Sequence, residues 1–278
     1  MSEKQIIEVE DYRHAEEAST FARVSQHPIV VKLISAIDSV QHKLLKGFKL
    51  GKMVRVTRKQ FPVLHATLTN HCRLLGVEPP TIYVSNHPMM NAYTNGLQAD
   101  EETFIVLHSS LFDTATPEQM SSIIGHELGH IKSNHRLYRV LMMLLFGQAT
   151  ALLAQLPDLL RIPLALSAKT LLMRYVRACE YSCDALGYIL CADIAAALKA
   201  ELLLSAGSQT LASQVNVAEF LKQADELDRA ELLSKAGMML MAEQITHPFG
   251  PHRVRELIRF ASRRRTKELL AWRRQRAA

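Results

Sequence analysis

One short segment holds three residues whose types and spacing suit a metal-dependent hydrolytic site. It reads His126-Glu127-Leu128-Gly129-His130. Residues four apart lie just over one helical turn apart, so both imidazoles project from one face and can bind one zinc ion together. Glu127 lies one position further on, where its carboxylate can reach a water on the metal instead of the metal itself. Because a five-residue pattern with three fixed positions also recurs by chance, the rest of the chain has to support it.

A catalytic zinc ion takes a third protein ligand and leaves its fourth position to water. In metzincins this ligand is a histidine six residues beyond the motif, preceded by a glycine. Ser133 and Arg136 occupy those two positions here, so the spacing excludes that class. His135 falls one residue short of the ligand position, and we expect it to lie behind the ligands or at the surface.

The best candidate for the third ligand is Glu180, which lies in an apparently helical stretch downstream. Asp184 follows it by one turn and faces the same way, so it can accept a hydrogen bond from the distal N–H of a ligating histidine. Two carboxylates at this spacing are also typical of a solvated helix face, and only the upstream motif favours the metal site. Cys179 and Cys183 flank Glu180, and we expect both to be small buried side chains that face away from the metal.

The elements that position these residues are predicted to be mostly helical, since only 6% of the chain is aromatic while Leu, Ala and Met abound. A helix should begin at Thr116-Pro117, because Thr is a good N-cap, Pro suits the first position and Gln119 completes a capping box. The fold class is therefore α+β and predominantly α-helical, with a zincin-like core, extra helices and a small, mostly antiparallel sheet. Strands are expected at Met53–Thr57, Thr81–Ser85 and Thr103–His108, a helix at Phe61–Leu75, and an edge strand or loop at Asn91–Gly96.

One uncharged stretch raises the question of a membrane. Val140–Pro157 carries no charged side chain, and Leu159–Met173 carries only Arg161 and Lys169. The first block is at the lower limit of length for a membrane span. Its polar residues, and prolines at 157 and 163, favour a helical hairpin over residues 137–175 that is buried or lies on a membrane surface, rather than a spanning pair.

The net charge of +6 belongs mainly to the C-terminal region, where nine Arg and one Lys from Arg253 onward face only two acids. This region is predicted to form a basic amphipathic helix. Such a helix more commonly exposes its charged face to solvent, and the alternative is that it binds anionic lipid or a partner. The N-terminus is polar without an apolar core, and four cysteines show no C-x-x-C, so we expect a reducing compartment, the cytoplasm. Residues 140–173 are the segment that would lie on or in a membrane.

Taken together, these blocks resemble zinc metallopeptidase family M48, which includes bacterial heat-shock membrane proteases and CAAX prenyl endopeptidases. The matching blocks follow in order: Pro80–Val84, Asn91–Tyr93, Phe104–His108, His126–His130, Glu180–Asp184, and His247-Pro248 followed by Arg253. The combination is far more specific than any one block.

The resemblance implies one zinc ion per chain on His126, His130 and Glu180, with Glu127 as the catalytic carboxylate and Asp184 behind the ligands. It further implies that His247 and Arg253 lie beside the cleft, where His247 would stabilise the oxyanion and Arg253 would orient Glu180, Asp184 or the His247 loop. The alternative is a simple turn with a solvated arginine. Asn91, Ala92 and Tyr93 resemble the edge strand against which a peptide substrate lies.

These features predict a zinc-dependent metalloendopeptidase that cleaves proteins or peptides with a zinc-activated water and Glu127 as general base and acid. The alternative is a non-catalytic zinc-bearing scaffold or chaperone-like membrane-associated protein, which would not need Glu127. Residues 1–50 are expected to form an N-terminal helical extension, and residues 51–278 the peptidase domain. No nucleic-acid partner is expected, because only the arginine-rich end suggests one.

Overall fold

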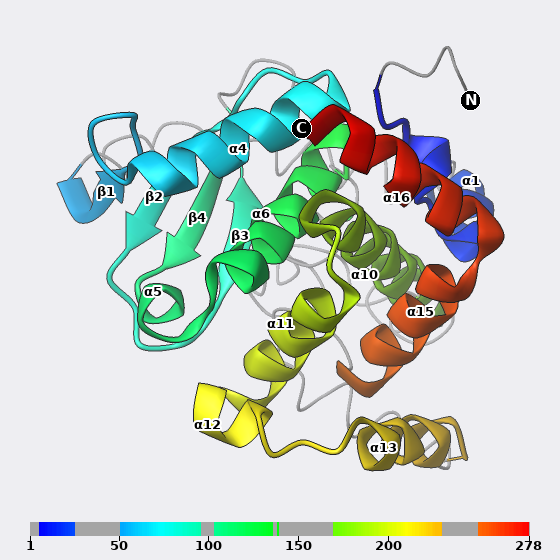
Figure 1. Cartoon of the computed structure of the whole chain (residues 1–278). Helices are drawn as coiled ribbons and strands as arrows, with labels where there is room; N and C mark the ends of the chain where they lie inside the picture. The colour runs from blue at the N-terminus through cyan, green and yellow to red at the C-terminus, as the bar shows by residue number, and fades with distance from the viewer. Residues whose placement is uncertain are drawn as a thin grey trace, which may run out of the picture.

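A computed structural model describes residues 6–25, 51–95, 103–135, 138, 169–229 and 250–277. Within these ranges the chain is mostly helical, with one four-stranded sheet (Figure 1). The sheet lies on one side of helix α6 (Pro117–Lys132), and helix α10 (Lys169–Cys191) lies on the other. The predicted metal ligands are on these two helices, so the packing of α6 against α10 decides the geometry of the site.

The sheet consists of β1 (Met53–Arg55), β2 (Thr81–Ser85), β3 (Ala92–Asn95) and β4 (Phe104–His108), in the order β1-β2-β4-β3. β1 pairs with β2 and β3 with β4 in antiparallel fashion, whereas the central pair β2–β4 is parallel. The sheet is therefore mixed, and the parallel pair was not expected. It arises because the chain runs from β2 to the far edge as β3 and returns between them as β4. Since β4 is buried along its whole length, the most apolar strand occupies a central place.

Local sequence explains where the helices of this half begin and end. Thr116 caps α6 with the predicted capping box to Gln119, and Pro117 occupies the first turn. Helix α4 (Pro62–Leu75) ends at Gly76, whose φ of 61° is left-handed and suits glycine. A short helix α5 (Ser110–Thr114) connects β4 to α6.

Further helices complete the second half of the chain. Asp193 caps α11 (Ile194–Ala206) through the amides of Ala195 and Ala196. Two peripheral helices follow, α12 (Gln209–Ala212) and α13 (Val217–Arg229). The basic C-terminal region forms two helices, α15 (Gly250–Ser262) and α16 (Arg264–Ala277), where the sequence had suggested one. Their apolar residues Leu257, Phe260, Leu269, Leu270 and Trp272 are all buried in the main core.

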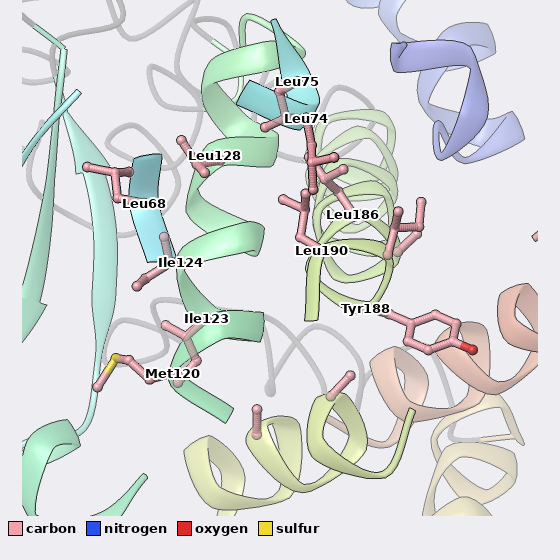
Figure 2. Packing of buried hydrophobic residues seen from close by; sticks show 14 of the residues in the cluster. Leu68, Leu74, Leu75, Met120, Ile123, Ile124, Leu128, Leu186, Tyr188 and Leu190 are labelled. Carbon is pink, nitrogen blue, oxygen red and sulfur yellow. The ribbon is translucent and has the colours of Figure 1, made fainter. Parts of the chain in front are cut away.

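The main core lies between α4, α6 and α10, and Figure 2 shows its side chains. α4 contributes Leu68, Leu74 and Leu75, α6 contributes Met120, Ile123, Ile124 and Leu128, and α10 contributes Leu186, Tyr188 and Leu190. Burying a side chain of this size stabilises the fold by roughly 1.5–3 kcal/mol.

Glycines let α6 and α10 approach closely on the face that carries the ligands. A Cβ built on Gly187 would lie 2.7 Å from the Ser122 carbonyl oxygen, and one built on Gly129 would lie 2.9 Å from the Cys183 sulfur. Both distances are too short for real atoms, so a larger residue would force the helices apart. The close approach therefore depends on glycine at these two positions.

The N-terminal segment crosses the outer side of α10. It contains the short 3₁₀ helix η1 (Val9–Asp11) and α1 (Ala15–Ser25). The His14 amide donates to Ser182 Oγ on α10, and the Ile7 amide donates to the Leu74 carbonyl on α4. Ile7 and Tyr12 are buried, so this segment is packed on the helices that carry the site.

Most of the expected hairpin at 137–175 lies outside the described residues, as does the second half of the expected N-terminal extension. No described helix combines the length with the apolar composition that a membrane span requires.

Candidate active site

His126, His130 and Glu180 converge in the buried space between α6 and α10. Nε2 of His126 lies 3.5 Å from one Glu180 carboxylate oxygen, and Nε2 of His130 lies 3.6 Å from the other. The two histidines are on one face of α6, as the spacing predicted, and α10 brings the carboxylate between them. All three side chains are buried.

The separations suit a tetrahedral zinc ion. Zinc binds nitrogen and oxygen ligands at about 2.0–2.2 Å, which at a tetrahedral angle places two ligand atoms roughly 3.4 Å apart. The two distances of 3.5 and 3.6 Å are close to that value. The donor set of two imidazoles and one carboxylate is also one that zinc peptidases use.

Cys183 also faces this space, contrary to the expectation that it faces away. Its Sγ and one nitrogen each of His126 and His130 lie within 4.8 Å of one another. Burial, together with nearby Glu180, raises the pKa of the Cys183 thiol well above its ordinary value of 9.0. A protonated thiol is a poor metal ligand, because the thiolate is the form that binds. Without a metal the thiol is protonated, so Glu180 stays the predicted third ligand.

Asp184 and Arg253 hold His126 from behind. Nδ1 of His126 lies 2.8 Å from Asp184 Oδ1, and Arg253 donates to both carboxylate oxygens of Asp184, with its Nε 2.9 Å from Oδ2. Arg253 also donates to Glu201 at 3.0 Å and is only 3% exposed, so it is not a solvated residue. Of the roles left open for it, its hydrogen bonds match orientation of Asp184, and its Nη2 also lies 3.7 Å from Oε2 of Glu180.

The charges of this cluster determine its protonation. Burial lowers the pKa of His126, but the hydrogen bond to Asp184 and the charges of Glu180 and Asp184 outweigh it and raise that pKa to about 9. Burial raises the pKa of Asp184, but Arg253 outweighs this effect and holds the pKa below its usual 3.8. Asp184 is therefore an anion that favours a hydrogen on Nδ1 of His126.

Glu127 is held by strand β3. The hydroxyl of Thr94 lies 2.7 Å from Glu127 Oε2, to which it donates, and 3.0 Å from the Glu127 carbonyl oxygen. Ala92 and Tyr93 begin this strand and Asn91 directly precedes it. Ala92 also shares a pocket with His126, Glu127 and Asp184. The segment predicted to bind substrate therefore lies beside the predicted catalytic carboxylate.

Three residues of the site, Tyr138, Thr94 and Glu201, had no signal in the sequence. Tyr138 donates to Glu180, Thr94 to Glu127, and Arg253 to Glu201. His135 is buried with Nδ1 3.0 Å from His130 Nδ1, which answers the open question of its location. These contacts join separate elements at spacings that no helical or strand period would reveal. His247 lies outside the described residues.

Comparison with known proteins gives a consistent result. A model of peptidase family M48 matches residues 58–261. A chloroplast protein of Arabidopsis thaliana, plastoglobule-localized metallopeptidase 48, is 27% identical over 267 residues, or 95% of this chain and 76% of that protein. A protease HtpX homologue of Bacteroides fragilis is 28% identical over 100 residues, or 36% of this chain and 30% of that protein.

Among solved structures, S. mikatae Ste24p is similar with a TM-score of 0.47 at 16% identity, covering 86% of this chain and 60% of that one. The chain thus spans about three quarters of the plant relative's length but less than a third of the bacterial one's.

Proposed function

Because the chain belongs to peptidase family M48, we propose that it is a zinc-dependent metalloendopeptidase that hydrolyses peptide bonds in proteins or peptides. The observation that carries the proposal is the convergence of two imidazoles and one carboxylate at zinc-like spacing, with Glu127 lining the same pocket as His126. His126, His130 and Glu180 would hold the ion. The chemistry supplied by a zinc ion there is Lewis-acid polarisation of the scissile carbonyl and of the attacking water.

Glu127 would act as the general base and acid. It takes the proton from the attacking water and later delivers it to the leaving amine, a role worth about 10²–10⁴ in rate. Thr94 supports this role because its hydroxyl holds Oε2 of Glu127 in one orientation. Asp184, itself held by Arg253, keeps the hydrogen of His126 on Nδ1. Nε2, which faces Glu180, is then the nitrogen with a lone pair for the metal.

The substrate would lie along β3 as an extended strand, with Asn91, Ala92 and Tyr93 forming part of its binding surface. This arrangement is supported by the contact between Thr94 of the same strand and Glu127. His247, which precedes α15, stays a predicted donor to the oxyanion. The domain division also stays a prediction, with a helical extension over residues 1–50 and the peptidase domain over residues 51–278. The cytoplasmic location is likewise a prediction.

The test is cleavage of casein and of a broad peptide set with added zinc, comparing the natural chain with Glu127→Gln. We expect one zinc ion per chain in both proteins, and a rate at least about 10²-fold lower in the variant. Equal zinc content matters, since it shows that the substitution removed the carboxylate and not the metal. If both proteins bind zinc and neither cleaves any peptide, the zinc-bearing scaffold is the better description.

A further inference from the structure

Behind His130 lies a second buried pair, His135 and Glu17, contributed by different elements. His135 follows α6 and Glu17 is on α1, and the two are only 1% and 3% exposed. Nδ1 of His135 lies 3.0 Å from Nδ1 of His130. Its other nitrogen, Nε2, lies 3.3 Å from Oε1 of Glu17. One imidazole therefore connects a predicted metal ligand to a carboxylate of the N-terminal segment.

The tautomers of His130 and His135 follow from the number of hydrogens that each imidazole carries. A neutral imidazole carries one hydrogen on two nitrogens, and the nitrogen that binds a metal carries none. If Nε2 of His130, which faces Glu180, binds the metal, then Nδ1 of His130 carries the hydrogen and donates it to His135. Nδ1 of His135 must then accept, so its hydrogen is on Nε2, facing Glu17. A carboxylate can only accept a hydrogen bond, so Glu17 suits the hydrogen that Nε2 of His135 carries.

Two further contacts agree with this assignment. The Cys183 sulfur lies 3.6 Å from Nδ1 of His135, where a thiol can act as a second, weak donor. Glu17 is fixed by Ser182 Oγ, which donates to one oxygen, and by Arg13 Nε at 3.0 Å from the other. The Nε2 of His135 and Oε1 of Glu17 are not aligned as an ideal hydrogen bond, so Glu17 acts mainly through its charge.

We propose that Glu17 and His135 are positioning residues, which hold His130 in the tautomer that presents Nε2 to the metal. This inference rests on the proposed function, since it assumes a metal ion on His130. The N-terminal segment would then contribute to the metal affinity of the site, although it supplies no ligand.

A second metal ion is the competing interpretation. Glu17, His135 and Cys179 each offer a ligand atom within 4.8 Å of the others. A metal on Nε2 of His135 would, however, move that ring's hydrogen to Nδ1, facing His130. His130 would then have to accept on Nδ1 and carry its own hydrogen on Nε2, where the catalytic metal belongs. A metal ion on Glu17, His135 and Cys179 would therefore oppose a metal ion on His130. For this reason we favour the positioning role.

The direct test uses the natural full-length chain loaded with zinc and labelled with ¹⁵N-histidine. The ¹⁵N chemical shifts distinguish a nitrogen that carries hydrogen from one that does not. We expect His135 to carry its hydrogen on Nε2 and His130 on Nδ1. A hydrogen on Nδ1 of His135 would overturn the inference, and no variant has to fold for this result.

The second test measures the zinc dissociation constant by competition with a chelator. Removing a group that orients a metal ligand costs about 10–100-fold in affinity, and we expect this loss for Glu17→Leu and for His135→Phe. Glu17→Gln keeps an oxygen acceptor but removes the charge, so it should lose nearly as much affinity as Glu17→Leu. The matched control is Glu16→Leu on the same helix, since Glu16 is half-exposed and contacts Arg174 instead.

The losses of zinc affinity caused by replacing Glu17 and by replacing His135 should also be coupled. Once His135 is replaced, Glu17→Leu should cost no further affinity, whereas a merely structural role predicts that the losses add. Additive losses, or affinity unchanged in Glu17→Leu, would overturn the inference. So would two zinc ions in the natural chain that fall to one in this variant. A natural chain that binds no zinc would instead refute the proposed function itself.

Discussion

At the scale of single residues, helical spacing accounts for much of the candidate site. His126, Glu127 and His130 belong to one helix, and Glu180 and Asp184 to another, so helical spacing predicts which residues of each set share a face. The family resemblance was also visible in the sequence, and the family match confirms it. Thr94, Tyr138 and Glu17 could not be assigned, because their contacts depend on which elements meet in space. Cys183 was misjudged for the same reason: its helix face is defined by its packing against Gly129.

One residue-scale prediction concerns the hydroxyl that holds Glu127. Thr94→Val keeps the shape of the side chain but removes the donor to Oε2. A hydrogen bond to a charged group contributes about 1.5–3 kcal/mol, so we expect kcat/KM to fall roughly tenfold to a hundredfold. Steady-state kinetics on a peptide substrate measures this loss. Thr94→Ser should retain most of the activity, and equal losses in both variants would argue against a role for the hydroxyl.

At the scale of elements, three helices share one buried group of charges. Arg253 on α15 donates to Asp184 on α10 and to Glu201 on α11. The sequence indicated Arg253 by family likeness, but Glu201 lies in a helix whose pattern is almost uniformly apolar and gave no sign of this contact. The sheet also has a feature that the sequence did not predict. Its strands were recognisable from composition, yet the parallel pairing of β2 with β4 depends on chain routing, which local sequence does not specify.

Removal of Arg253 should therefore destabilise the packing of these helices. Arg253→Met leaves Asp184 and Glu201 buried without their cation, which costs about 3–5 kcal/mol. Urea unfolding of the metal-free protein measures the loss. Arg264→Met is the control, because Arg264 is exposed and its pair with Glu268 should contribute less than about 1 kcal/mol. Similar losses in the two variants would contradict the special role of the buried group.

The close approach of α6 and α10 gives a second prediction at this scale. Gly187→Ala places a methyl group 2.7 Å from the Ser122 carbonyl oxygen, so one helix has to move. We expect a loss of about 1–3 kcal/mol in stability and weaker zinc binding, since the movement separates the histidines from Glu180. Gly207→Ala is the comparison, because its left-handed φ makes it destabilising while no atom lies near its Cβ. Zinc affinity that falls equally in both variants would contradict a local effect.

At the scale of the whole molecule, one buried histidine links folding to pH. His71 on α4 donates through Nε2 to the Ser121 carbonyl oxygen on α6. Burial lowers the pKa of His71 from 6.5 to about 4, so the folded state resists the charged form. Because the folded pKa is depressed, the stabilising contribution is fully present above about pH 6.5 and is lost as the pH falls towards 4.

The shift corresponds to about 3 kcal/mol over this range. We expect the free energy of unfolding to fall by that much more between pH 7.5 and pH 4 in the natural chain than in His71→Gln. The glutamine can still donate to Ser121 but does not titrate. Chemical unfolding at a series of pH values measures the difference, and parallel curves for the two proteins would contradict the prediction.

The buried charges around Arg253 also bear on the order in which the molecule becomes functional during its synthesis. A ribosome releases α6 and α10, with every predicted metal ligand, before α15 has emerged. Until then Asp184 and Glu201 lack the cation that makes their burial favourable. These two carboxylates consequently gain their cation only when α15 docks, one of the last steps in the folding of the described chain.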